Sequence, residues 1–260
     1  MRIINLSSGS DGNITYIETE NLKILLDDGL SAQKTVEKLK KISIAPSDIN
    51  AIILSHEHSD HTKGVDVFAT KFNIPVYAHE NVWLGLDEKL KQVPLKNRKI
   101  FENEFELNDL LITPFEVPHD VSCYGFSFQK DNKKIAFATD LGHFNDKIIA
   151  NLMQSRIVYI ESNYDRDLLF KGTKYPLSLK RRIDGPNGHL ENIDSADAIE
   201  RLAIGGTRQF VLAHLSKENN TPTIAYSTAC NYLQKDGIQE GRDIKIDVAT
   251  TEIGTMFKLK

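Results

Sequence analysis

The sequence lacks the features that mark disulfide-rich or membrane-embedded proteins. It has only two cysteines, Cys123 and Cys230, each among apolar neighbours, which predicts buried thiols in a reducing compartment rather than a disulfide framework. No apolar run approaches the roughly 18–20 residues that a membrane-spanning helix needs, and no apolar signal segment opens the chain. We therefore expect a cytoplasmic protein that does not enter a membrane.

An excess of positive charge is also lacking. The formal net charge is −4 at pH 7, so the overall electrostatics do not indicate a nucleic-acid binder, although bound divalent ions would make part of the surface positive. The composition, 40% hydrophobic and 26% charged residues, is ordinary for a globular protein. Because no low-complexity linker or internal repeat divides the chain, we expect residues 1–260 to form a single domain without an inserted one.

The most informative stretch is Ser55-His-Glu-His-Ser-Asp-His61, which holds three of the eight histidines of the chain. It follows the apolar run 51–54 and precedes a helix predicted to begin near residue 62. His56 and His58 are two apart, so on an extended strand end both side chains leave the same face. Asp60 and His61 lie where the chain turns and can address a second ion alongside. Imidazole and carboxylate suit zinc or manganese, which favours a metal site over a solvated loop.

Five apolar segments after this stretch each end in a side chain that can bind a metal. The segments are 74–78, 111–118, 134–139, 157–160 and 209–213, and the residues after them are His79, His119, Asp140, Glu161 and His214. Amphipathic helices are predicted at 31–42, 146–154 and 193–204. Since functional sites of α/β proteins collect where strands end, we expect several of these side chains to share one rim.

The segment before the histidine cluster predicts a β-hairpin and a further strand. Residues 2–6 and 14–18 alternate as strands do and are joined by a Ser/Gly loop, 7–13. Its hydroxyl, amide and backbone N–H groups suit a phosphate, although an ordinary turn has the same composition. Residues 23–26 predict a strand that ends at Asp27-Asp28-Gly29. A carboxylate there either orients a ligand histidine or forms an acidic turn.

His56-x-His58-x-Asp60-His61, followed by His119, Asp140 and His214, resembles the metallo-β-lactamase superfamily over the whole chain. The resemblance implies an α/β fold, an αββα sandwich of two mixed sheets flanked by helices, with two divalent ions, Mn²⁺ or Zn²⁺, at one edge. It implies one ion held by His56, His58 and His119, another held by Asp60, His61 and His214, and a bridging Asp140. His79 and His143 fall outside the pattern and are expected to be structural.

Within that superfamily the chain resembles the YycJ/WalJ-type stand-alone proteins of low-GC Gram-positive bacteria, which are regarded as 5′→3′ DNA exonucleases. The resemblance rests on the loop 7–13 and on the segments 161–165 and 188–192. The interval between Asp140 and His214 leaves little room for the large extra domain of RNA-processing relatives. The chain departs from the family's Gly-His-Leu-Ser-Asn at Glu191, which leaves the role of His189 intact.

The resemblance also implies roles in phosphodiester hydrolysis. Asp60 would orient a metal-activated water, and His189 would contact the scissile phosphate or protonate the leaving oxygen, unless it is a loop histidine without a chemical role. Residues 171–182 contain five cations and one aromatic, which favours contact with nucleic acid over a merely solvated face. The residues expected to bind substrate are Ser8, Ser10, Asn13, Asn163, Arg181 and Asn192.

The leading hypothesis is therefore a metal-dependent phosphodiesterase that acts on DNA ends. Three alternatives use the same cluster: a hydrolase of small thioesters or lactones, an RNA-processing nuclease, and a non-catalytic metal-binding signalling protein. Hydrolysis of β-lactams is disfavoured because no export signal is seen.

Overall fold

The structure, a computed structural model, describes residues 1–259, and the chain divides into two compact units. Unit 1 contains Met1–Pro114, Val121–Cys123 and the residues from Thr251 on. Unit 2 contains Phe115–Asp120 and Tyr124–Thr250. The single domain expected for residues 1–260 stays a prediction.

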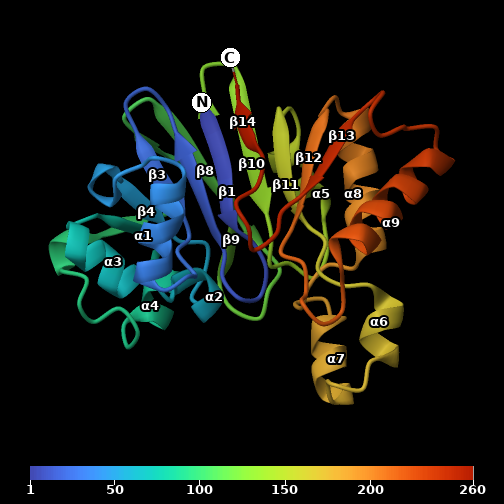
Figure 1. Ribbon diagram of the computed structural model, residues 1–260, viewed down its shortest axis with the longest axis horizontal. Helices are drawn as coiled ribbons and strands as arrows, with labels where there is room; N and C mark the ends of the chain where they lie inside the picture. Colours follow the sequence, from blue (N-terminus) through green and yellow to red (C-terminus); the bar gives the residue numbers. More distant parts are fainter. Residues whose placement is uncertain (260) are drawn as a thin grey trace. The chain divides into compact units, whose positions relative to one another are not determined.

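Unit 1 is built on a seven-stranded mixed sheet with the strand order β14-β1-β2-β3-β4-β5-β6 (Figure 1). The strands are β1 (Arg2–Ser7), β2 (Ile14–Glu18), β3 (Lys23–Leu26), β4 (Ala51–Ile53), β5 (Val76–His79), β6 (Arg98–Phe101) and β14 (Met256–Lys258). β1 pairs antiparallel with β2, which confirms the predicted hairpin, whereas β3 to β6 run parallel. The carboxyl ends of β3 and β4 consequently meet at one edge of the sheet.

The helices α1 (Ala32–Lys41), α3 (Val65–Phe72) and α4 (Glu80–Leu86) lie along one side of this sheet (Figure 1). α1 begins where Ser31 accepts a hydrogen bond from Lys34 N, and of its apolar side chains it buries Leu39, together with the polar Thr35, while Val36 is half-buried. The helix expected to begin near residue 62 is in fact two helices. A short helix, α2 (Ser59–Thr62), begins three residues earlier than expected and precedes α3. Two short 3₁₀ helices, η1 (Pro46–Asp48) and η2 (Leu95–Asn97), complete the connections.

The second seven-stranded sheet has the order β13-β12-β11-β10-β9-β8-β7. Its strands are β7 (Phe105–Leu107), β8 (Leu110–Val117), β9 (Cys123–Lys130), β10 (Lys133–Ala138), β11 (Ile157–Glu161), β12 (Gln209–Ala213) and β13 (Lys245–Val248). Along the chain, β8 passes from unit 1 to unit 2 after Pro114. β10 to β13 are parallel, so the ends of β10, β11 and β12 lie side by side at one edge.

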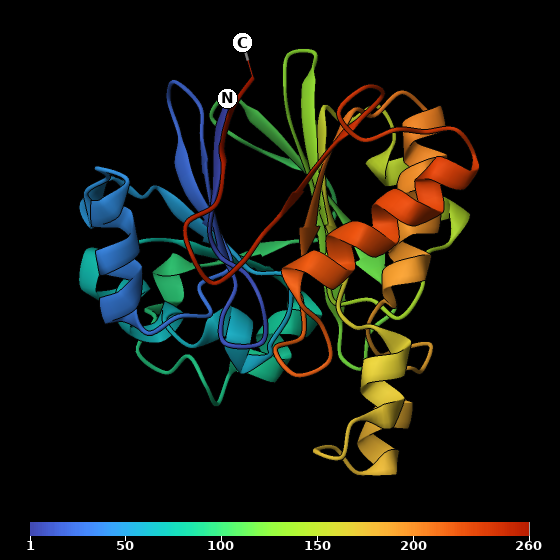
Figure 2. The same cartoon turned by 45° about the vertical axis from the view of Figure 1, so that its right-hand side comes forward.

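The helices of unit 2 are α5 (Asp146–Leu152), α6 (Arg166–Lys171), α7 (Leu177–Ile183), α8 (Asn192–Ile204) and α9 (Pro222–Lys235). α8 and α9 pack against each other, and α9 also packs against β13 (Figure 2). α6 and α7 form a pair that extends away from the second sheet in both views (Figures 1 and 2). We call α6, α7 and the residues between them, 166–183, the helical arm.

Both cysteines are free, and Cys123 is buried, but Cys230 on α9 is only half-buried, so the prediction of a buried thiol was wrong there. The apolar neighbours of Cys230 along the chain do not cover it, because a helix turns successive residues to different faces. Within residues 1–259, no helix is long and apolar enough to cross a membrane.

Candidate metal centre

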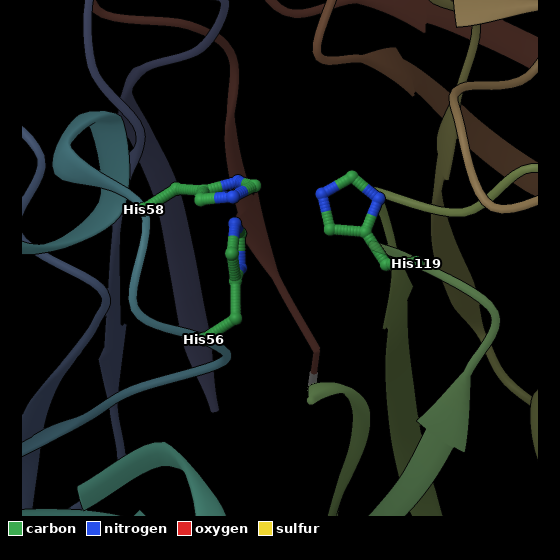
Figure 3. A group of neighbouring side chains, drawn as sticks. All are labelled: His56, His58 and His119. Atoms are coloured by element: carbon green, nitrogen blue, oxygen red, sulfur yellow. The ribbon is translucent and has the colours of Figure 1, made fainter. Parts of the chain in front are cut away.

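In unit 1 the histidine cluster forms a compact group directly after β4. The ring centroid of His56 lies 4.7 Å from that of His58 and 4.2 Å from that of His61. Figure 3 shows the rings of His56 and His58 turned edge to face, and it also draws His119 of unit 2. The short helix α2 folds the chain back, since His61 N donates to His58 O at 3.0 Å. Asp60 Oδ2 lies 3.6 Å from His61 Nε2.

Asp27, at the end of β3, orients two of these imidazoles. Its Oδ2 lies 2.7 Å from His61 Nδ1 and accepts from Ser55 Oγ at 2.9 Å, while its Oδ1 accepts from Ser55 N at 2.8 Å. Ser55 Oγ in turn lies 3.0 Å from His56 Nδ1. The predicted histidine-orienting carboxylate is therefore confirmed at Asp27. The neighbouring Gly29 allows the close packing of this loop, because a Cβ there would lie 1.6 Å from Asp60 O.

The Ser/Gly loop after β1 contacts the same cluster through Asn13. Asn13 Nδ2 lies 3.0 Å from His61 Nε2 and 3.3 Å from Asp60 Oδ2, and Asn13 N donates to Asp60 O at 2.7 Å. Of the two serines expected to bind substrate, Ser8 is buried and Ser10 is exposed. The loop thus lies against the candidate ligands, and substrate binding by these three residues stays a prediction.

Unit 2 contains a second cluster, at the adjacent ends of β10, β11 and β12. One ligand atom from each of Asp140, Glu161, His189 and His214 lies within 4.8 Å of the others. Asp140 and His214 adopt left-handed backbone conformations, with φ of 59° and 56°, as Asp27 does in unit 1 with 58°. Such conformations are uncommon outside glycine and concentrate at functional sites.

Glu161 is the hub of the second cluster, and its role escaped the sequence analysis. Its Oε1 lies 2.9 Å from His189 Nδ1 and 2.8 Å from His214 Nδ1. Its Oε2 accepts from Leu141 N at 2.9 Å and from Leu190 N at 3.3 Å. These four contacts fill the acceptor positions of a carboxylate, so we interpret Glu161 as a residue that positions both histidines rather than as a metal ligand.

Burial and the neighbouring charges shift the pKa values of Glu161 and His189 in opposite directions. Complete burial by itself would raise the pKa of Glu161, but the imidazoles of His189 and His214 hold that pKa well below its ordinary value. Burial would likewise lower the pKa of His189, and the Glu161 carboxylate more than reverses this, so the pKa of His189 is raised. One feature of the sequence could have indicated this role of Glu161: it ends a predicted strand that lies between the strands ending at Asp140 and His214.

The histidines share a hydrogen-bonding pattern that suits metal ligands. In His56, His61, His119 and His214 the Nδ1 atom is hydrogen-bonded, and their partners are Ser55 Oγ, Asp27 Oδ2, Gly188 O at 3.1 Å and Glu161 Oε1, respectively. A histidine that binds zinc through Nε2 usually has its Nδ1 held by such a hydrogen bond. The two clusters therefore have the donor types and orientations to bind divalent ions.

The two remaining histidines have other contacts. His79 Nδ1 accepts from Asn81 N at 3.2 Å and so caps α4, and His143 Nδ1 lies 3.0 Å from Pro186 O. Both contacts agree with the predicted structural roles.

Asn163 and Asn192, which were expected to bind substrate, are buried in unit 2. Asn163 Nδ2 donates to His214 O at 2.7 Å, and Asn192 Oδ1 accepts from Ser162 Oγ at 2.6 Å and from Asn220 Nδ2 at 2.9 Å. These bonds hold the loops around His214, and the substrate-binding role of both asparagines stays a prediction.

The five cations of residues 171–182 have unequal surroundings on the helical arm. Three pair with carboxylates: Lys171 with Asp167 at 2.7 Å, Lys174 with Glu218 at 2.5 Å, and Arg182 with Asp120. Lys180 is buried and donates to Phe170 O at 3.0 Å. Arg181 is exposed and makes no ion pair within this described segment. The basic run therefore leaves Arg181 as the cation that a polyanion can reach without breaking an ion pair.

The sequence of this chain is similar to those of known proteins over most of its length. Residues 23–215 match the family model described as a beta-lactamase superfamily domain. The exodeoxyribonuclease WalJ of Streptococcus pneumoniae is 37% identical over 246 residues, which cover 93% of this chain and 91% of that protein. The exodeoxyribonuclease YycJ of Bacillus anthracis is 34% identical over 244 residues, with coverages of 93% and 92%.

Two solved structures agree in fold at low sequence identity. The metallo-β-lactamase fold protein YhfI from Bacillus subtilis superposes with a TM-score of 0.73 at 14% identity over 99% of both chains. Zn²⁺-bound PqqB from Methylobacterium extorquens superposes with a TM-score of 0.74 at 14% identity over the full length of both chains. The predicted fold and the predicted family resemblance are both confirmed.

Proposed function

Because this chain belongs to the beta-lactamase superfamily, we propose that it is a metal-dependent nuclease that degrades DNA from an end. The observation that supports the proposal is the pair of ligand clusters, in which four histidines are hydrogen-bonded through Nδ1, the arrangement that is usual for histidines that bind a metal through Nε2. The names and the near-complete coverage of the WalJ and YycJ relatives support DNA as the substrate. The proposed direction of cleavage is 5′→3′.

We propose seven metal ligands and two ions, Mn²⁺ or Zn²⁺. His56, His58 and His119 would hold one ion, Asp60, His61 and His214 the other, and Asp140 would bridge them. Two such ions, when bound, lower the pKa of a water and stabilise negative charge on a phosphodiester. Asp27 and Glu161 keep the ligand imidazoles in the tautomer that leaves Nε2 unprotonated.

His189 is the proposed proton donor to the leaving oxygen. Its Nδ1 is held by Glu161, so the ring presents Nε2 to a substrate, and its raised pKa favours the protonated form that a general acid needs. Asp60, which is about one quarter exposed, is the proposed residue that orients the attacking water.

The substrate class and the metal requirement can be tested together. The wild-type protein, Asp60→Asn and the control His79→Gln are incubated in zinc or manganese with 5′-phosphorylated duplex DNA, single-stranded DNA, RNA and thioesters. We expect nucleotides to be released from DNA, the rate to fall by about 100-fold or more in Asp60→Asn, and His79→Gln to remain active. Chelation with EDTA should abolish the activity, and either zinc or manganese should restore it.

Elemental analysis of protein purified without added metal gives the number and identity of the ions. Turnover of thioesters with inert DNA would contradict the proposed substrate, and faster cleavage of RNA than of DNA would favour an RNA-processing enzyme. Two bound ions without turnover of any substrate would favour a binding or signalling role.

A further inference from the structure

Unit 1 has a cavity of about 500 Å³ between α1 and α3, away from the histidine cluster. Its apolar lining comes from Ala32 and Val36 on α1 and from Val67 and Phe72 on α3. Val67 is 49% exposed, and the other three side chains are half-buried. The two helices contact each other, so the cavity forms a groove along their junction. We call it the α1–α3 groove.

Two lysines lie beside this apolar lining, one from each helix. Lys40 follows Val36 by four residues on α1, and Lys71 follows Val67 by four residues on α3, so each helix presents an apolar side chain and then a cation on the same face. Neither lysine makes an ion pair with another described residue. Lys71 Nζ rests 5.5 Å from the ring centroid of Phe72, which keeps its charge over the groove.

The charge around the groove differs in sign from that of the chain as a whole. Two of the three charged side chains that line it are cations, Lys40 and Lys71, whereas the net charge of the protein is −4. Glu37 also lines the groove, but its Oε1 accepts from Gln33 Nε2 at 3.0 Å. Lysines near a helix C-terminus stabilise that end of the helix, but this role does not explain why exposed apolar side chains lie beside them. The combination of exposed apolar side chains and lysines indicates a binding surface.

We propose that the α1–α3 groove docks an acidic segment of a partner protein, with apolar side chains against Val36 and Val67 and carboxylates paired with Lys40 and Lys71. Helix pairs with an apolar groove are a common way to bind a short peptide. Nucleic acid fits less well, because the aliphatic lining provides no stacking surface apart from Phe72 and two cations neutralise few phosphates. The inference is independent of the nuclease proposal, since none of the candidate metal ligands lines the groove.

The test measures binding of fluorescein-labelled peptides to the full chain by fluorescence anisotropy. The probes are short peptides with four aspartates next to Leu, Ile and Phe in three different spacings, and the same peptides with lysine in place of aspartate. The groove variants are Val67→Glu and Lys40→Glu/Lys71→Glu. Leu95→Glu and Lys96→Glu are matched controls, because Leu95 is 81% exposed, Lys96 is exposed, and neither lines the groove.

We expect saturable binding of at least one acidic peptide that weakens about tenfold in each groove variant, falls with added salt and is unchanged in the controls. The lysine peptides should not bind. Release of nucleotides from bare DNA should be the same in the groove variants as in the wild type, so a failure of the nuclease proposal would leave this result unaffected.

Three results would overturn the inference. One is failure of the peptide test, either because no acidic peptide binds saturably or because Val67→Glu and Leu95→Glu bind the peptide equally. Another is loss of DNA binding in Lys40→Glu/Lys71→Glu with no change in peptide binding, which would make the groove a nucleic-acid surface. The third is a wild-type dimer in sedimentation that Val67→Glu converts to a monomer, which would assign the groove to a second copy of the chain.

Discussion

Replacing Glu161 with Gln probes the hub of the second cluster without changing its size. The carboxylate accepts four hydrogen bonds, two from backbone N–H groups of Leu141 and Leu190 and two from histidine Nδ1 atoms. An amide keeps one oxygen and gains two donors, so Gln can satisfy only one of these pairs. Either orientation therefore breaks half of the hub.

The structure allows the size of each loss to be estimated. If the Gln oxygen faces the histidines, two buried N–H groups lose their acceptor, at a cost of about 1–3 kcal/mol each. If the amide nitrogen faces the histidines, His189 and His214 must accept at Nδ1, which places the proton on Nε2 and removes the proposed ligand atom of His214. Loss of such a positioning contact typically lowers metal affinity or activity about 10–100-fold.

The assay separates metal binding from folding. Metal affinity is measured by titration of the apoprotein, and stability by urea unfolding in EDTA. We expect Glu161→Gln to bind metal about 10–100-fold more weakly and to release nucleotides from DNA correspondingly more slowly. His189→Gln, which keeps Glu161, should lose activity but retain metal affinity. Wild-type metal affinity and wild-type activity in Glu161→Gln would refute the reasoning.

Two further predictions concern a buried carboxyl and the helical arm. Burial, opposed by a hydrogen bond from Thr35 and assisted by Asp27, raises the pKa of Asp28 to about 7. In the folded state Asp28 therefore stays protonated at pH values above 3.8, where the same carboxyl group is ionised in the unfolded chain. The free energy of unfolding should consequently fall by up to roughly 4 kcal/mol as the pH rises from 4 to 8. Asp28→Asn should remove this dependence in urea unfolding; identical pH profiles would contradict it. Arg181→Ala should weaken DNA binding and lower the salt slope by about 1, whereas the ion-paired Lys171 should matter less when replaced by Ala. Equal effects of the two substitutions would count against Arg181.

The histidine cluster could be predicted from the sequence because its geometry is local. His56, His58 and His61 lie within one strand end and one helical turn, so their spacing fixes which side chains meet. Asp27 was also predictable, since β3 pairs with β4 and both strands end beside the cluster. The helices α1 and α8 followed from their apolar period, to within one residue at each end.

Contacts between distant residues could not be predicted in this way. The sequence shows Glu161 at a strand end, but only the folded edge shows that His189 and His214 both turn Nδ1 toward it. From the sequence alone, the basic run 171–182 presents five cations. Two of its partners, Glu218 for Lys174 and Asp120 for Arg182, lie far along the chain, and the burial of Lys180 depends on how the helical arm folds. Charge counting shows where cations stand, but not which are already neutralised.

The left-handed backbone at Asp140 and His214 restricts these positions independently of any ion. A β-branched residue at such a φ is strained by about 1–2 kcal/mol, whereas Asn, Asp, His and Gly are tolerated. Drift toward valine, isoleucine or threonine is therefore opposed by folding itself, even in a lineage that no longer needs catalysis. The backbone thus restricts Asp140 and His214 to a small set of residue types that includes Asp and His, so their presence in a sequence is weaker evidence of a working enzyme than the presence of His56 and His58.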